Sequence, residues 1–207
     1  MDLTHAHKSI SRAIEPYKKP FVICEDGRSQ TKLSNKGRVG FKIEEILGIP
    51  ANKSRKPDYH GWEIKATKVG KGFVIGTMTI DEFHAIDNSS CLLFTASDPY
   101  QKIKQTALVF YELLERRPDP LYQILGCSMI NFASMSKDIK DELQSDYEFI
   151  CSHVKKCRSR DDVTRNLQRN GTISGEYLKL TYKGQGSGGY NYPAWKLSDK
   201  FMKKIYD

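Results

Sequence analysis

The sequence predicts a single α/β (α+β) domain, residues 1–207, built on a mixed β-sheet core that helices flank. Three observations lead to this fold class. The chain of 207 residues is long enough to bury a substantial core. Its apolar residues recur at helical spacing in some segments and at strand spacing in others. These segments do not alternate regularly, as they would around a purely parallel sheet.

The first third of the chain predicts two helices and a strand. Residues 4–15 are amphipathic and indicate an opening helix that ends before Pro16. Residues 21–24 form a short apolar strand candidate. Residues 38–47 indicate a second helix, because their apolar side chains recur at i, i+4, i+7 and i+8, and Gly48 closes it.

The middle of the chain predicts more strands and two longer helices. Strands are expected at residues 73–80, at residues 91–95 and in part of the apolar stretch 121–132. The strand at 91–95 is expected to be fully buried. The expected helices are residues 99–116 and 136–153, each with apolar anchors on one face.

The last fifty residues change in character. Residues 161–167 predict a short helix and residues 177–182 an alternating strand. A glycine-rich, aromatic segment, 183–192, follows and precedes a lysine-rich tail.

The charge of the chain is unevenly distributed. The net charge is +8. Residues 1–75 carry 15 basic and 8 acidic side chains, residues 76–149 carry 6 and 12, and residues 150–204 carry 12 and 4. Two basic ends around an acidic middle indicate a phosphate-binding surface, although ordinary solubility charge would give a similar total.

Cysteine usage and hydropathy indicate the cellular compartment that suits the protein. The five cysteines form no dense disulfide framework, which favours a reducing environment and a cytoplasmic protein. The spacing Cys151, His153, Cys157 offers three zinc ligands without an obvious fourth, so a closed zinc site is not predicted. No stretch has the apolar length of a membrane span, and no membrane partner is expected.

The strongest chemical signal lies between Pro57 and Lys65. Glu63 and Lys65 are two residues apart in a strand-like run, which places both side chains on one face of the strand. Asp58 precedes them across a short bend that contains Gly61. Two carboxylates and an ammonium group suit a hard cation, an attacking water and a phosphodiester, which is the chemistry of a Mg²⁺-dependent nuclease.

The same residues also allow interpretations in which they have a structural role and no catalytic one. Asp58 alone would shape a Pro-Asp turn, and Glu63 with Lys65 would be a surface ion pair. His60, inside the bend, reads as a solvent-exposed turn residue. Glu44 favours the catalytic interpretation, because it lies at the border of the apolar stripe of the helix 38–47 and would reach a neighbouring cleft.

Residues 36–68 resemble the MutH/MvaI/BcnI branch of the PD-(D/E)XK nucleases. The resemblance lies in Gly40, in Glu44 followed by Leu47-Gly48, and in the run from Asp58 to Lys65. Residues 175–180 are similar to a late strand that precedes DNA-contacting residues in that family. The resemblance implies a restriction-endonuclease-like fold and a type II restriction enzyme.

The resemblance also implies roles for individual residues. Asp58 and Glu63 would ligate the catalytic Mg²⁺, Lys65 would orient the attacking water, and Glu44 would be an auxiliary carboxylate. The products would carry a 5′-phosphate and a 3′-hydroxyl. One catalytic set per chain cuts one strand at a time, so the enzyme would act as a monomer or a homodimer.

The expected partner is double-stranded DNA. We expect approximately residues 1–120 to carry the Mg²⁺ site and approximately 121–207 to recognise DNA. Candidate DNA-binding residues in the second part are basic, amide or aromatic, namely Arg158, Arg160, Arg165, Arg169, Lys179, Lys183, Gln185, Tyr190, Asn191, Tyr192 and Lys196. The alternatives are a repair-type nicking endonuclease on the same scaffold and a DNA-binding module without catalysis. An RNA-directed nuclease is less favoured, because no aromatic RNA-binding motif is present.

Overall fold

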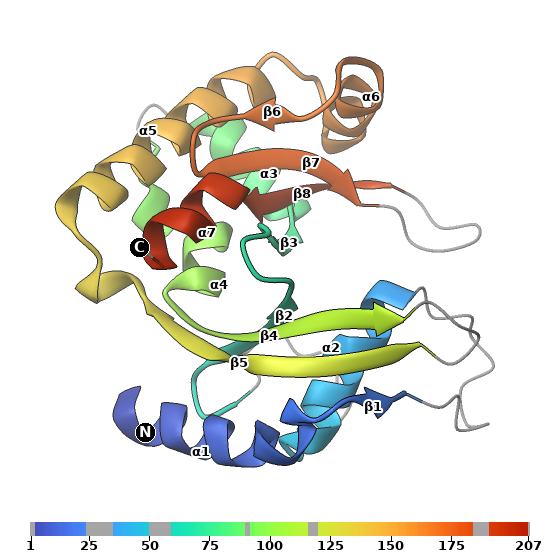
Figure 1. Cartoon of the computed structure of the whole chain (residues 1–207). Helices are drawn as coiled ribbons and strands as arrows, with labels where there is room; N and C mark the ends of the chain where they lie inside the picture. Colours follow the sequence, from blue (N-terminus) through green and yellow to red (C-terminus); the bar gives the residue numbers. More distant parts are fainter. Residues whose placement is uncertain are drawn as a thin grey trace. The chain divides into compact units, whose positions relative to one another are not determined.

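The computed structural model describes residues 3–23, 35–49, 59–89, 92–115, 120–183 and 191–206. The chain forms two compact units (Figure 1). The first unit contains residues 1–69 and 105–130, and the second contains residues 70–104 and 131–207.

The first unit is a mixed sheet with two helices. Its elements are α1 (Leu3–Ile14), a 3-10 turn (Glu15–Lys18), β1 (Phe21–Val22), α2 (Asn35–Ile46), β2 (Glu63–Thr67), β4 (Gln105–Glu115) and β5 (Leu121–Asn131). The strand order is β1-β5-β4-β2, with β2 parallel to β4 and β1 antiparallel to β5.

One face of this sheet forms the core of the first unit. Ile10 of α1 and Ile43 of α2 pack in one cluster with Ile64 of β2, Val109 of β4 and Ile124 of β5. These side chains are all less than 7% exposed. Because Ile64 faces this core, its neighbours Glu63 and Lys65 are directed to the opposite face of β2.

The second unit is an antiparallel sheet surrounded by helices. Its elements are β3 (Val74–Thr77), α3 (Ile80–Asn88), η2 (Phe94–Ala96), α4 (Asp98–Ile103), a 3-10 turn (Phe132–Ser134), α5 (Lys137–Val154), α6 (Arg160–Asn170), β6 (Ile173–Ser174), β7 (Leu178–Lys183), β8 (Tyr192–Leu197) and α7 (Asp199–Tyr206). The strand order is β3-β8-β7-β6.

Aromatic side chains hold the second unit together. Tyr147 of α5 packs between Phe94 of η2 and Trp195 of β8, with ring centroids 5.6 and 5.5 Å apart. Phe132 and Tyr100 extend the cluster with a centroid distance of 4.9 Å. The cluster joins segments distant in sequence, which is how short strands acquire a stable core.

Most of the expected elements are present. The expected helices at 4–15, 38–47, 136–153 and 161–167 correspond to α1, α2, α5 and α6, and α6 is longer than predicted. The expected strands near residues 21, 74, 121 and 178 are present as β1, β3, β5 and β7. The prediction of a mixed α/β fold is confirmed, whereas the division into two sheets was not predicted.

Two predicted elements are wrong. The helix expected over residues 99–116 is a short helix, α4, followed by the long strand β4. Ala107, Leu108 and Val109 are consecutive apolar residues and all are buried, so this run does not alternate as a half-buried strand would and also fits helical spacing. Of the strand expected at 91–95, Cys91 lies outside the described residues, and Phe94 and Thr95 belong instead to the 3-10 helix η2. Leu93, just before this helix, is 57% exposed.

Candidate active site

Glu63 and Lys65 lie together on one face of β2. The Lys65 Nζ donates to Glu63 Oε1 at 2.6 Å. The Glu63 side chain is 7% exposed and the Lys65 side chain 26%. The predicted placement of both side chains on one strand face is therefore confirmed. The pair is largely buried on the Glu63 side and partly open to solvent on the Lys65 side.

A tight turn leads into β2. Tyr59 and Trp62 exchange two backbone hydrogen bonds of 2.9 and 2.8 Å. His60 and Gly61 between them have φ values of 47° and 90°, which define a two-residue hairpin turn. Glycine suits the second position, because L side chains are strained there. His60 is exposed, as the sequence predicts.

The turn is anchored on both sides. The Tyr59 hydroxyl lies 2.8 Å from Ser9 Oγ of α1. Trp62 is 2% exposed. These contacts fix the position from which β2 starts, and hence the position of Glu63.

Asp58 lies outside the described residues, so its predicted place beside Glu63 stays a prediction. Glu44 is half-buried on α2, directly after Ile43 of the core. Glu45, next to it, is exposed and pairs with Lys42 at 2.8 Å. This difference agrees with the helical spacing, which places Glu44 at the border of the buried stripe and Glu45 on the far side.

The donor set of this site suits a hard divalent cation. Carboxylate oxygens are the ligands that Mg²⁺ prefers. Across the residues that the structure describes, no three His, Cys, Asp or Glu side chains group so as to hold a metal ion. The structure describes Glu63 but not Asp58. The fit of this site to Mg²⁺ therefore follows from the carboxylate chemistry of these two residues and not from a distance between them.

Several candidate DNA-binding residues meet on the β7–β8 hairpin. Lys179 pairs with Lys196 and Lys183 with Tyr192 in the antiparallel register. The alternate residues of both strands, such as Leu180 and Trp195, are buried. The hairpin therefore has one core face and one face rich in lysine.

Arg160 is brought to the same hairpin. Its guanidinium carbon lies 4.7 Å from the ring centroid of Tyr192, which is a cation–π contact. Asn191, next to Tyr192, is half-buried. Two predicted residues from different elements, Arg160 and Tyr192, therefore form one contact.

Other candidates are not brought to this contact. Arg165 pairs with Asp162 on α6 at 3.7 Å. Arg158 and Arg169 are exposed near the two ends of α6. Gln185 and Tyr190 lie outside the described residues.

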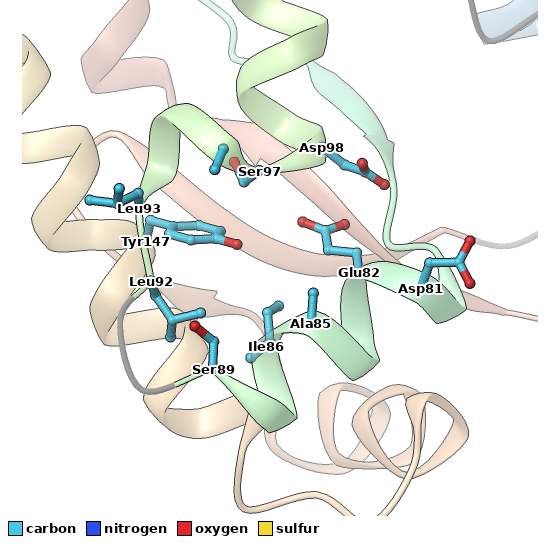
Figure 2. A pocket seen from close by; sticks show the side chains of 11 residues that line it. Asp81, Glu82, Ala85, Ile86, Ser89, Leu92, Leu93, Ser97, Asp98 and Tyr147 are labelled. Atoms are coloured by element: carbon cyan, nitrogen blue, oxygen red, sulfur yellow. The ribbon is translucent and has the colours of Figure 1, made fainter.

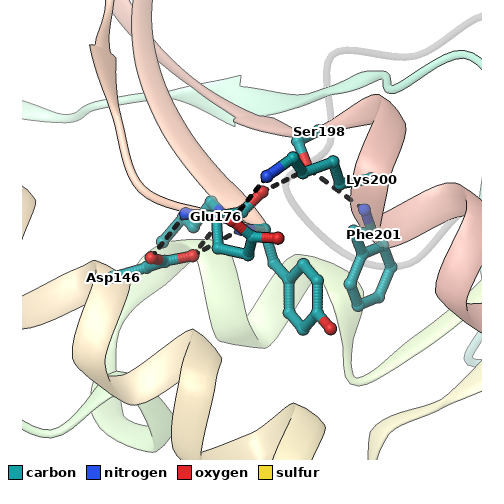
Figure 3. Close-up of polar contacts among 7 residues, drawn as sticks. Asp146, Glu176, Ser198, Lys200 and Phe201 are labelled. Atoms are coloured by element: carbon teal, nitrogen blue, oxygen red, sulfur yellow. Dashed lines mark hydrogen bonds and ion pairs between the residues drawn. The ribbon is translucent and has the colours of Figure 1, made fainter.

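The start of β7 is held by a buried carboxylate (Figure 3). Asp146 of α5 accepts backbone hydrogen bonds from Glu176, Tyr177 and Leu178 at 2.7, 2.6 and 2.8 Å. A side chain at Gly175 would collide with Asp146. Sequence analysis missed Asp146, because one acid on an amphipathic helix carries no signal of a distant backbone partner.

Sequence analysis also missed Glu82, a buried carboxyl on α3. The sequence Thr79 to Glu82 has the spacing of a capping box, and Thr79 Oγ1 accepts from the Glu82 backbone N–H at 3.0 Å. That spacing is the signal by which the helix and its glutamate were recognisable.

Comparison with known proteins relates the chain to restriction endonucleases. Residues 20–82 match the family model of the MvaI/BcnI restriction endonuclease family. Comparison with curated proteins finds no match. None of the helices in the described ranges is long and apolar enough to cross a membrane.

A solved structure of the restriction endonuclease MvaI with its cognate DNA substrate has a similar fold. It superposes with a TM-score of 0.52 over 99% of this chain and 96% of that chain, at 10% sequence identity. The resemblance that residues 36–68 predict is confirmed by the family match, and the restriction-endonuclease-like fold is confirmed by the superposition. The family match over residues 20–82 relates the chain to restriction enzymes, whereas the superposition shows the fold alone.

Proposed function

We propose that this protein is a site-specific endonuclease of double-stranded DNA that hydrolyses phosphodiester bonds with Mg²⁺, as type II restriction enzymes do. The match to the MvaI/BcnI family supports this class of enzyme. The observation that carries the chemistry is the Glu63–Lys65 pair on the face of β2 opposite the core. The proposal places the Mg²⁺ site in the first unit and DNA recognition mainly in the second.

Asp58 and Glu63 would hold the cation. In the sequence, Asp58 directly precedes the two-residue turn that the Tyr59–Trp62 bridge closes, and Glu63 directly follows it. When bound, Mg²⁺ supplies Lewis-acid polarisation of the phosphate and a bound water of lowered pKa.

The residues of the chain position the other reactants. The Lys65 ammonium, held 2.6 Å from Glu63, orients the attacking water and offsets the negative charge that develops on the phosphate. Glu44 of α2 would be an auxiliary carboxylate near the metal site. Hydrolysis leaves a 5′-phosphate and a 3′-hydroxyl.

The test is digestion of unmethylated phage-length DNA with Mg²⁺ or with EDTA. We expect the wild type to give discrete fragments only with Mg²⁺. We expect Lys65→Ala to reduce cleavage by at least about 100-fold, because a preorganised charge at the developing transition state is lost. DNA binding by this variant, measured by gel shift, should be retained.

Lys68→Ala is the matched control, because Lys68 is exposed just beyond the end of β2. It should cut like the wild type. Nicks without double-strand breaks would indicate a repair-type nicking activity instead of restriction. DNA binding without cleavage in any divalent metal would leave a DNA-binding module and overturn the proposal.

A further inference from the structure

Charge limits which surface of the second unit suits DNA. A pocket of about 290 Å³ opens beside α3 (Figure 2). The exposed carboxylates of Asp81 and Asp98 belong to its lining, and none of its described lining residues is a lysine or an arginine. Because carboxylates repel the phosphates of DNA, we place the DNA contact on the basic surface of α6 and the β7–β8 hairpin instead.

Arg160 differs from the other arginines of that surface in the way it is held. It is the first residue of α6 and is half-buried, with its guanidinium carbon 4.7 Å from the ring centroid of Tyr192. The other three, Arg158, Arg165 and Arg169, are exposed and stack on no ring in the described part of the chain. Arg160 is therefore the arginine whose orientation the fold restricts.

The contact with Tyr192 leaves the outer end of the Arg160 guanidinium for a ligand. Its Nε is buried and has no hydrogen-bond partner among the described residues. The donors that a ligand reaches are those of the two terminal NH₂ groups, which lie in one plane and accept nothing. Because the ring holds this plane in place, binding costs little additional side-chain entropy. The matching partner is a pair of acceptors side by side in one plane.

Guanine is the base that offers such a pair in the major groove. Its O6 and N7 are both acceptors, whereas adenine and cytosine present an amino donor and thymine a single acceptor oxygen. Phosphates also accept from arginine, but Lys179, Lys183 and Lys196 of the hairpin supply charges for them. A lysine ammonium is a flexible point charge and suits a phosphate, whereas a fixed planar group suits a base edge.

We propose that Arg160 is a specificity-determining residue that reads a guanine of the recognition sequence in the major groove. Tyr192 is the positioning residue that holds its guanidinium. This inference rests on the proposed recognition of double-stranded DNA, but not on its cleavage.

The test measures binding, so that it does not depend on catalysis. Selection of bound duplexes from a random-sequence pool, with the Lys65→Ala variant, gives the recognition sequence. Each guanine of that sequence is then replaced by 7-deazaguanine, which lacks the N7 acceptor and keeps its base pairing. We expect at least one replacement to weaken binding about 5-fold or more, because a two-acceptor contact is broken.

Substitutions in the same background assign that guanine to Arg160. Arg160→Ala should bind guanine and 7-deazaguanine equally at that position and accept other base pairs there. Tyr192→Leu should reduce the preference for guanine, and Tyr192→Phe, which keeps the ring, should retain it. Arg169→Ala is the matched control, because it removes an exposed arginine near the other end of α6 and should leave the preference unchanged.

The outcomes separate this inference from the proposed nuclease activity. If Arg160→Ala weakens binding to all sequences equally and keeps the preference for guanine, Arg160 contacts a phosphate and the inference is wrong. The same holds if no 7-deazaguanine replacement changes binding, or if selection yields no preferred sequence. If the wild type cuts no DNA but its guanine preference depends on Arg160, the nuclease proposal fails and this inference stands. Should Arg160→Ala not fold, the comparison of Tyr192→Leu with Tyr192→Phe tests the same contact.

Discussion

Glu82 is a buried carboxyl whose surroundings disfavour its charge. Burial raises the pKa of Glu82 to about 8, the hydrogen bond from Trp195 opposes this, and the nearby Asp98 charge adds to the rise. The same hydrogen bond ties α3 to β8. The protonation of one side chain is therefore coupled to the packing of the second unit.

The raised pKa of Glu82 predicts a stability that falls with pH. Between its ordinary pKa of 4.5 and about 8, the folded protein holds a proton on Glu82 that the unfolded chain releases. The free energy of unfolding is therefore highest below pH 4.5 as far as Glu82 is concerned, and decreases as the pH rises toward 8. Each unit of pKa difference corresponds to about 1.4 kcal/mol.

Urea unfolding of the wild type and Glu82→Gln at pH 5, 6, 7 and 8 measures this effect. The difference in unfolding free energy between the two proteins should change steadily in favour of the variant across this range. A constant difference would mean that Glu82 is ionised in the folded protein throughout.

At the level of elements, a single carboxylate joins α5 to the start of β7. Asp146 is 4% exposed and accepts three backbone N–H groups, two just before the strand and the third from its first residue, Leu178. On the other side, Ser198 Oγ donates to the Glu176 carbonyl at 2.7 Å, and Lys200 pairs with the Glu176 side chain at 2.8 Å (Figure 3). These contacts hold the strand whose register sets Lys179 opposite Lys196.

We expect Asp146→Asn to destabilise the protein by about 2–4 kcal/mol. The amide offers a neutral acceptor in place of a charged one, and its NH₂ group faces backbone donors that then lose their partner. The unfolding midpoint in urea measures the loss. In the variant, the amide protons of residues 176–178 should exchange faster than in the wild type. Exchange in α1, which does not take part in this contact, should not change.

Asp141→Asn is the control for this substitution, since Asp141 is an exposed acid on the same helix. It removes the same charge without a backbone contact. Equal unfolding midpoints for the two variants would show that the three hydrogen bonds contribute nothing to stability.

Across the whole molecule, charge is segregated along the chain. Residues 150–204 carry 12 basic and 4 acidic side chains, whereas residues 76–149 carry 6 and 12. On the β7–β8 hairpin, Lys179 and Lys196 are directly opposed, and like charges in that position repel each other. A phosphate between them would relieve the repulsion, which favours backbone contact rather than base reading for these two lysines.

Salt dependence tests this assignment. In a Lys65→Ala background, the logarithm of the DNA-binding constant should fall linearly with the logarithm of salt concentration, by roughly 0.9 for each phosphate neutralised. Lys179→Ala/Lys196→Ala should reduce the slope by about 2. The control Lys104→Ala/Lys137→Ala removes two exposed lysines from the acidic segment, residues 76–149. It should leave the slope unchanged. Equal slopes in the two double variants would exclude the hairpin lysines from the DNA contact.

The sequence by itself determined the features that depend on neighbouring residues. The two-residue spacing of Glu63 and Lys65 places both on one strand face whatever the strand packs against. The periodicity of α1, α2 and α5 likewise follows from local spacing, as does the turn that ends at Trp62. These features include the Glu63–Lys65 pair, which is why the family resemblance was recognisable from residues 36–68.

Only the tertiary structure decided the features that join distant segments. Residues 105–115 have an apolar run compatible with helix or strand, and their pairing with β2 made them a strand. Asp146 acquired its role from backbone donors about thirty residues away, and Glu82 from Trp195 in another element. Such partners are chosen by packing, and the free energy of a buried polar group depends on what the fold places beside it.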